Sequence, residues 1–151
     1  MQTTLVLLKP DCLQRRLAGA VLQRFEQKGL RLAGLKLVQP SRALAEQHYA
    51  VHKGKPFYDS LLKFLTSGPT LAVALEGREA VTVVRAMMGA TDGAKSPPGT
   101  IRGDYALSVQ NNLIHGSDSP ETAETEIALW FRPEELVNYQ TIDVAVITGA
   151  N

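Results

Sequence analysis

The sequence lacks the features that mark several large classes of protein. Its 151 residues include one cysteine, Cys12, so no disulfide can form within the chain. No apolar run approaches the roughly 20 residues that cross a bilayer, because residues 5–8 are followed directly by Lys9 and Pro10. Nothing basic precedes this run, as a signal peptide would require. We therefore expect a soluble cytoplasmic protein without a membrane contact.

Neither sign of charge is in excess. Sixteen Lys and Arg residues face fifteen Asp and Glu residues, a net charge of +1, which gives no general attraction to nucleic acid. Hydrophobic residues make up 44% of the chain and charged residues 21%, an ordinary globular mixture. A chain of this length suits a single domain, which we expect to cover residues 1–151.

The common phosphate and metal motifs are absent as well. There is no Gly-x-x-x-x-Gly-Lys loop, no Gly-x-Gly-x-x-Gly and no His-Glu-x-x-His. His48 and His52 are spaced to share one helix face, but zinc sites usually need at least three protein ligands, so surface or capping roles are favoured.

The hydrophobic pattern predicts alternating strands and helices with no internal linker. We expect strands at 3–8, 30–38 and 70–75, and helices at 18–28, 41–49, 58–65, 78–88 and 119–131. Residues 89–103 form a long irregular segment with four glycines, and such loops are usually functional. Residues 105–109 are expected to be extended, and 142–147 to form a final strand or packed tail.

His115 is the histidine best placed for chemistry. It precedes the last expected helix, beside the flexible Gly116 and the polar Ser117 and Asp118. Because histidine titrates near neutral pH, a nucleophilic or acid/base role competes with that of a loop histidine beside a helix cap.

Three cations and two aromatic residues are candidates for binding a phosphorylated ligand. Arg102 lies between two glycines and offers a fork of donors, with Arg85 and Lys9 as further cations. Without a ligand, Arg102 would be a turn residue, Arg85 a charge at a helix end, and Lys9 a solvated lysine. Phe57 and Tyr49 either pack in the core or stack on a base.

Together, five segments resemble nucleoside diphosphate kinases from about Thr3 to Asn138. They are Lys9-Pro-Asp11, Arg85-x-Met-x-Gly-x-Thr91, Pro98-Gly-Thr-Ile-Arg-Gly-Asp104, Asn112-x-x-His-Gly-Ser-Asp118 and Glu126-Ile-x-x-x-Phe131. The resemblance implies an α+β fold, a ferredoxin-like α/β sandwich with an antiparallel βαββαβ sheet and additional helices. Residues 139–151 are an unmatched C-terminal tail.

The resemblance also implies a reaction and its residues. The γ-phosphoryl group of a nucleoside triphosphate would pass to a nucleoside diphosphate by a ping-pong mechanism, through a phosphohistidine on His115. Catalytic roles fall to His115, Glu126, Ser117 and Lys9, and nucleotide binding to Lys9, Tyr49, Phe57, Arg85, Thr91, Arg102 and Asn112. Mg²⁺ would be held mainly by the nucleotide phosphates, without protein ligands. Family members are homo-oligomers, and we favour a hexamer over a tetramer.

Two alternatives stay open. A non-catalytic nucleic-acid-binding or regulatory protein on a ferredoxin-like fold is disfavoured by the balanced charge. A family member that acts mainly as an interaction partner is disfavoured by the full set of catalytic matches. Within the last helix, periodicity places Glu124 and Glu126 at opposite edges of the apolar face, and only the resemblance selects Glu126.

Overall fold

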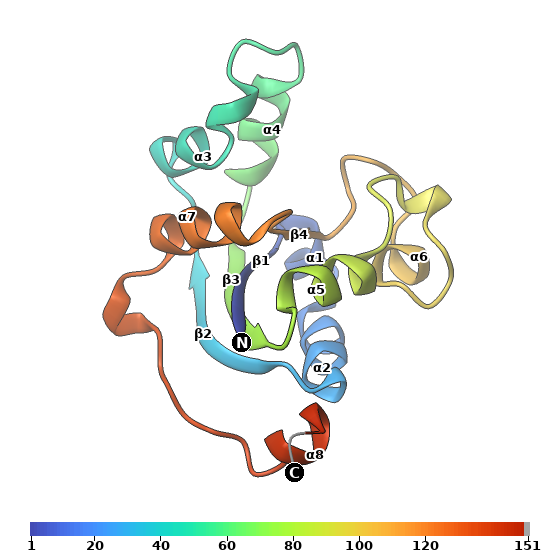
Figure 1. Cartoon of the computed structure of the whole chain (residues 1–151). Helices are drawn as coiled ribbons and strands as arrows, with labels where there is room; N and C mark the ends of the chain where they lie inside the picture. The colour runs from blue at the N-terminus through green and yellow to red at the C-terminus, as the bar shows by residue number, and fades with distance from the viewer. Residues whose placement is uncertain (150–151) are drawn as a thin grey trace.

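The computed structural model describes residues 1–149 (Figure 1). The strands are β1 (Gln2–Leu8), β2 (Arg31–Val38), β3 (Thr70–Gly77) and β4 (Ile114–Gly116). The helices are α1 (Pro10–Gln14), α2 (Ala18–Lys28), α3 (Arg42–His48), α4 (Tyr58–Leu65), α5 (Ala80–Met88), α6 (Ile101–Tyr105), α7 (Pro120–Trp130) and α8 (Val144–Thr148). Short 3₁₀ turns cover Ala50–His52, Gly93–Lys95 and Pro133–Glu135. None of the helices in this part of the chain has the length and apolarity of a membrane span.

The four strands form one antiparallel sheet in the order β2-β3-β1-β4. Helix α2 connects β1 to β2, and α5 connects β3 to β4, which gives the βαββαβ order of a ferredoxin-like fold. Helices α3 and α4 are inserted between β2 and β3, and α7 follows β4. The expected fold class is therefore confirmed.

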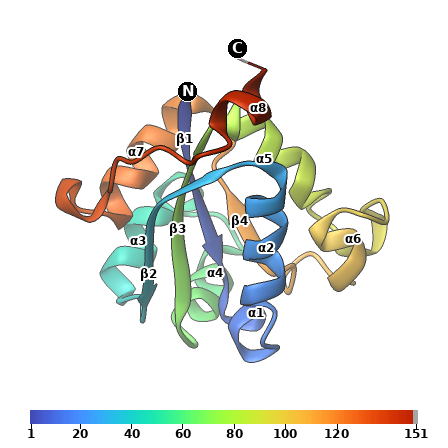
Figure 2. The same cartoon turned by 90° about the horizontal axis from the view of Figure 1, so that it is seen from below.

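Helices cover both faces of the sheet (Figure 2). Along β1, Val6 and Leu8 face the core that contains α2 and α5, whereas Leu5 and Leu7 face the core with α3, α4 and α7. Successive side chains of a strand point to opposite faces, so a central strand between two helical layers must be apolar at every position. This explains the unbroken apolar run of residues 5–8 in the sequence.

Local sequence signals begin and end several helices as expected. Gly29 ends α2 with φ of +104°, a conformation that glycine adopts without steric cost. Ser41 caps α3, where its Oγ accepts a hydrogen bond from the backbone N–H of Leu44 at 3.1 Å. Ser119 caps α7 in the same way, with Pro120 at the first helical position.

Two expectations about the second half of the chain were wrong, and one strand was not predicted. Residues 105–109 are not extended, because Tyr105 is the last residue of α6, a helix that begins inside the irregular segment. Of the two alternatives for residues 142–147, the strand was wrong, because Val144–Thr148 form helix α8; the segment packs as a tail, with the side chain of Ile147 against Gly29. The fourth strand is Ile114–Gly116, and three residues are too few to show the alternation that reveals a strand. The last two residues of the tail lie outside the described chain.

The first prediction concerns Gly103 in α6. A Cβ added to Gly103 would overlap the backbone carbonyl of Pro97, which cannot swing away as a flexible side chain can. Overpacking typically costs 1–3 kcal/mol, so we expect Gly103→Ala to lower the free energy of unfolding by about 2 kcal/mol or more.

Gly19 in α2 provides the matched control. A Cβ there meets nothing within 4 Å, so Gly19→Ala should raise the free energy of unfolding, by up to about 1 kcal/mol. Urea denaturation of both variants measures the two effects. Equal stability of Gly103→Ala and the wild-type protein would contradict the overlap.

Candidate active site

The register between β1 and β4 determines where His115 points. His115 lies opposite Leu7, and directly opposed residues of an antiparallel pair share a face of the sheet. This is the face covered by α3 and α7. Gly116 faces the other layer, where an added Cβ would lie 2.5 Å from Sδ of Met88, so a larger residue at this position would displace the Met88 side chain. His115 is thereby directed into the α3–α7 side of the molecule.

Backbone hydrogen bonds hold the segment before His115 against the end of β1. The Lys9 N–H donates to the carbonyl of Leu113 at 2.8 Å, and the Leu113 N–H donates to Oδ2 of Asp11 at 3.1 Å. Leu113 is fully buried with φ of +74°, a conformation that is unfavourable for a branched side chain. Nζ of Lys9 also donates to Oδ1 of Asn112 at 2.5 Å. Two motifs a hundred residues apart in sequence therefore form one structural unit.

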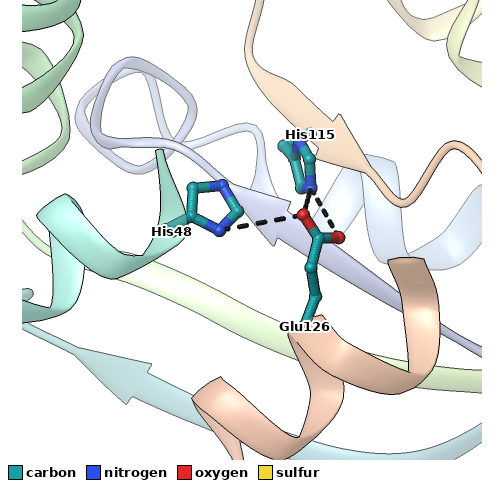
Figure 3. Close-up of side chains that lie close together, drawn as sticks. All are labelled: His48, His115 and Glu126. Carbon is teal, nitrogen blue, oxygen red and sulfur yellow. Dashed lines mark hydrogen bonds and ion pairs between the residues drawn. The ribbon is translucent and has the colours of Figure 1, made fainter. Parts of the chain in front are cut away.

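Glu126 holds the imidazole of His115 by one nitrogen (Figure 3). Nε2 of His115 lies 3.0 Å and 3.1 Å from the two carboxylate oxygens, and Oγ of Ser117 donates to Oε1 at 2.6 Å. Because an ionised carboxylate only accepts hydrogen bonds, Nε2 carries a proton and Nδ1 has the free lone pair. The arrangement can thus present Nδ1 of His115 as a nucleophile. Glu124, at the other edge of α7, is exposed.

The contacts of Glu126 also set its charge. Burial alone would raise the pKa of Glu126, but the hydrogen bonds from His115 and Ser117 outweigh burial and hold its pKa below the ordinary value. The carboxylate is therefore ionised at neutral pH and can stabilise positive charge on the imidazole.

His48 and Trp130 are two members of this cluster that sequence reasoning did not assign. Nε1 of Trp130 donates to Nδ1 of His48 at 3.2 Å, and the ring of His48 packs edge-on against His115 with centroids 4.7 Å apart. The expected shared face with His52 was wrong, because α3 ends at His48 and His52 belongs to the next 3₁₀ turn. Burial lowers the pKa of His48 to about 3, so it is neutral. A lone tryptophan on an apolar face is a signal for such a partner, since buried indole N–H groups usually find one.

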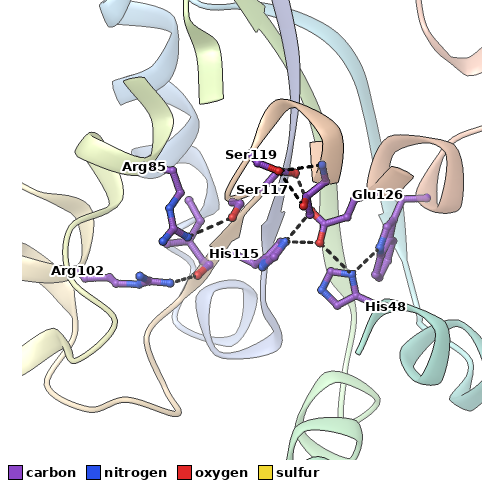
Figure 4. Close-up of polar contacts among 11 residues, drawn as sticks. His48, Arg85, Arg102, His115, Ser117, Ser119 and Glu126 are labelled. Atoms are coloured by element: carbon purple, nitrogen blue, oxygen red, sulfur yellow. Dashed lines mark hydrogen bonds and ion pairs between the residues drawn. The ribbon is translucent and has the colours of Figure 1, made fainter. Parts of the chain in front are cut away.

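Two of the predicted cations, Arg85 and Arg102, lie near His115, and neither they nor Lys9 form a salt bridge with a carboxylate among residues 1–149. The guanidinium of Arg102 donates to the carbonyls of Asn112 and Ile114 at 3.2 and 2.5 Å, and Arg85 donates to the carbonyl of Gly116 at 3.3 Å (Figure 4). Burial, helped by Arg85, lowers the pKa of Arg102 to about 10. Burial likewise lowers the pKa of Lys9 to about 8. Desolvated positive charge of this kind is stabilised by a bound anion.

A cavity of about 690 Å³ brings most of the predicted residues together. Its walls include six of them: Tyr49, Arg85, Thr91, Arg102, His115 and Glu126. Asn112 lies behind the wall, where Nδ2 donates to the carbonyl of Thr91 at 2.8 Å, and Ser117 lies behind Glu126. Phe57 is outside the cavity, 46% exposed, with its ring 5.3 Å from that of His52, which lines the cavity.

A model of the nucleoside diphosphate kinase family matches residues 2–136 of this chain. The chain belongs to the nucleoside diphosphate kinase family. It is 55% identical to the nucleoside diphosphate kinase of Carboxydothermus hydrogenoformans over 95% of this chain and 97% of that protein. Its identity to the enzyme of Rhodopirellula baltica is 56%, over 94% and 93% of the two chains.

Solved structures agree with the family assignment. A halophilic nucleoside diphosphate kinase from Halobacterium salinarum, in complex with CDP, superposes with a TM-score of 0.95 at 46% identity, over 97% of both chains. A family protein from Babesia bovis also gives 0.95, at 41% identity, over 97% of this chain and 99% of that one. The protein is thus a nucleoside diphosphate kinase that transfers a γ-phosphoryl group from a nucleoside triphosphate to a nucleoside diphosphate. The comparisons give no support to a non-catalytic nucleic-acid-binding or regulatory protein.

The second prediction concerns the hydrogen bond from Ser117 to Glu126. A carboxylate whose pKa is lowered by folding contributes stability that is complete above its ordinary pKa and is lost as the pH falls through the lowered value. Ser117→Ala removes one donor, so its destabilisation at pH 7 should shrink as the pH falls below about 4, where the carboxylate is protonated.

Ser119→Ala is the control, because it removes an uncharged cap of the same helix. Its destabilisation, about 1 kcal/mol, should change little with pH. Urea denaturation between pH 3 and 7 measures both differences. A pH-independent effect of Ser117→Ala would show that its hydroxyl does not act on the charged form of Glu126.

Proposed function

We propose that Nδ1 of His115 is the atom that carries the phosphoryl group between nucleotides. In the first half-reaction, the Nδ1 lone pair forms a bond to the γ-phosphorus. The bond between that phosphorus and the oxygen bridging it to the β-phosphate breaks, and the nucleoside diphosphate leaves with the bond electrons. A terminal oxygen of the acceptor diphosphate then attacks the same phosphorus, and the N–P electrons return to Nδ1. The observation that carries this proposal is the pairing of Nε2 with Glu126, which leaves Nδ1 free.

Glu126 and Ser117 prepare the imidazole for both half-reactions. Nε2–H stays hydrogen-bonded to the carboxylate, which stabilises the positive charge that the ring acquires when Nδ1 forms a bond to phosphorus. Ser117 fixes the carboxylate by its 2.6 Å hydrogen bond. Neither group needs to accept a proton in the transfer.

The cations stabilise the charge on the transferred group. Phosphoryl transfer depends mainly on positioning and electrostatic stabilisation, and Arg85 and Arg102 line the cavity beside His115. The hydroxyl groups of Tyr49 and Thr91 are donors on the same wall. We assign Lys9 and Asn112, which are joined by a hydrogen bond, to the sugar hydroxyls and adjacent phosphates.

Phe57 supplies a surface on which the base stacks. Its exposed ring follows the basic residues Lys53 and Lys55, and stacking on an aromatic face does not discriminate among bases. We therefore propose that nucleoside di- and triphosphates of every common base are substrates.

We infer that the required divalent cation is Mg²⁺, carried into the site on the nucleotide phosphates. Mg²⁺ commonly keeps several waters and binds one or two carboxylates besides the phosphates. The carboxylates of Asp118 and Glu121 line the cavity and would hydrogen-bond to the waters of an ion that the nucleotide phosphates hold. The ion neutralises phosphate charge, while the protein orients the nucleophile.

We also propose a cytoplasmic homo-oligomer, a hexamer in preference to a tetramer, without specific binding of nucleic acid or membranes. The exposed Leu35 and Leu37 on the edge strand β2 support assembly, because exposed apolar edges favour pairing with another chain. Residues 1–151 are proposed as one domain. Its tail begins against β2, where the hydroxyl of Tyr139 donates to the carbonyl of Leu32 at 2.7 Å.

The third prediction is a phosphoenzyme on His115. Incubation with γ-labelled ATP and Mg²⁺ should label the protein, and phosphohistidine should release the label in acid. Any nucleoside diphosphate should discharge it. His115→Ala should take up no label, whereas Glu124→Ala should label like the wild-type protein. Acid-stable label, or label that persists in His115→Ala, would refute this mechanism.

The fourth prediction concerns Phe57. Base–aromatic stacking contributes about 1–3 kcal/mol, so Phe57→Ala should weaken the binding of ADP, GDP, CDP and UDP by about this amount. Calorimetric titration of each diphosphate measures the loss. Val146→Ala, which shortens an exposed apolar side chain in α8, should leave all four affinities unchanged. A loss confined to one base would show that Phe57 does more than stack.

A further inference from the structure

We propose that Trp130 is a positioning residue that fixes the tautomer of His48 and so reserves the Glu126 carboxylate for His115 and Ser117. The inference rests on the proposed role of His115 as the phosphorylated residue. Trp130 contacts His48, and His48 in turn packs against His115. Trp130 itself is thus not proposed to touch the phosphorylated histidine or a substrate.

Two imidazoles lie beside one carboxylate. His115 uses both oxygens of Glu126, while Nδ1 of His48 lies 3.9 Å from Oε2 (Figure 3). A proton on Nδ1 of His48 would turn it into a second donor to Oε2 after a shift of about 1 Å. Such a bond would draw the carboxylate away from His115 and weaken its attraction for the imidazole N–H. The geometry of the nucleophile thus depends on which nitrogen of His48 is protonated.

Trp130 determines which ring nitrogen of His48 carries the proton. An indole N–H is a donor only, and Nε1 of Trp130 points at Nδ1 of His48 at 3.2 Å. Nδ1 of His48 must therefore be the accepting nitrogen, and the ring proton lies on Nε2. Trp130 is 3% exposed and the His48 side chain 1%, so water does not replace either partner. Reversing the tautomer would leave a buried N–H unsatisfied.

The same hydrogen bond removes a competing use of the cluster. His48, His115 and Glu126 place three possible metal ligands within 4.8 Å of one another. A metal bound through Nδ1 of His48 would need the lone pair of that nitrogen, and this lone pair is engaged by Trp130. The 3.9 Å separation from Glu126 is likewise no ion pair, because burial keeps His48 neutral.

A double-mutant cycle tests the inference. Trp130→Phe frees Nδ1 of His48 to donate to Glu126, and small misplacements of catalytic groups can cost up to 10²-fold, so we expect single-turnover phosphorylation of His115 to slow by about 10- to 100-fold. His48→Phe keeps an aromatic ring beside His115 but removes the rival donor. The double variant should therefore be phosphorylated faster than Trp130→Phe alone. A double variant as slow as Trp130→Phe, or slower, would overturn the inference.

Histidine ¹⁵N spectra give a second readout that does not depend on activity. The chain has three histidines, which makes assignment tractable, and one tryptophan. In the wild-type protein, Nδ1 of His48 should be unprotonated and Nε2 protonated. In Trp130→Phe the proton should move to Nδ1. Protonated Nδ1 in the wild-type protein, or no change in the variant, would overturn the inference even if the variant folds poorly.

Failure of the proposed function has a different signature. If wild-type protein takes no label on His115, the phosphohistidine mechanism fails, whereas the spectra still report the tautomer of His48. If wild-type protein is labelled normally but the double variant is not rescued, the role of Trp130 fails alone. Replacing the single tryptophan by its benzothienyl analogue, in which sulfur stands in place of N–H, should reproduce the effect of Trp130→Phe with the ring shape retained.

Discussion

The pairing of a three-residue strand with β1 is the constraint on which the active site depends. Register alone directs His115 to the layer that contains Glu126 and His48, since a shift by one residue would turn its side chain to the opposite face. So short a strand has few hydrogen bonds of its own. It is secured at its ends instead, by the Ser117 N–H that donates to the carbonyl of Leu5 and by the Arg102 guanidinium that bonds the carbonyl of Ile114. Arg102 is therefore part of the scaffold as well as a wall of the cavity.

The electrostatics of the cavity show a fold arranged for a ligand rather than for its own stability. Lys9 is buried beside the neutral Asn112, and burial brings its pKa down to about 8. Below pH 8 the buried charge of Lys9 lowers the stability of the folded state. This destabilisation is relieved as the pH rises from about 8 towards the ordinary pKa of lysine, 10.5. A bound phosphate would reverse the effect, because it favours the protonated form. If Lys9 binds the nucleotide as proposed, binding near pH 8 would be coupled to uptake of a proton by Lys9.

Sequence reasoning succeeded where a signal is local or combinatorial. The sequence predicted β1 from its apolar run, the end of α2 from Gly29, and the starts of α3 and α7 from Ser41 and Ser119. These signals act within a few residues of the chain. The resemblance predicted ten site residues, and six of them line the cavity. Sequence reasoning missed β4, because its three residues carry no pattern. It also missed the contacts of His48, whose partners His115 and Trp130 lie 67 and 82 residues away. Contacts of that range depend on sheet register and helix packing, which a single sequence does not contain.

The absence of a glycine-rich phosphate loop follows from the reaction the cavity is built for. A loop of backbone N–H groups holds phosphates against a helix N-terminus, but it offers no nucleophile. Here the proposed phosphate ligands are side chains from four separate segments: the end of α3, α5, the 89–103 loop with α6, and the turn after β1. His115, the middle residue of β4, is left free as the nucleophile. Both half-reactions then use the same phosphate positions, so the first nucleoside diphosphate must leave before the second enters. The proposed stacking on the exposed Phe57, outside the cavity, would suit this exchange, because stacking on an aromatic face does not discriminate among bases.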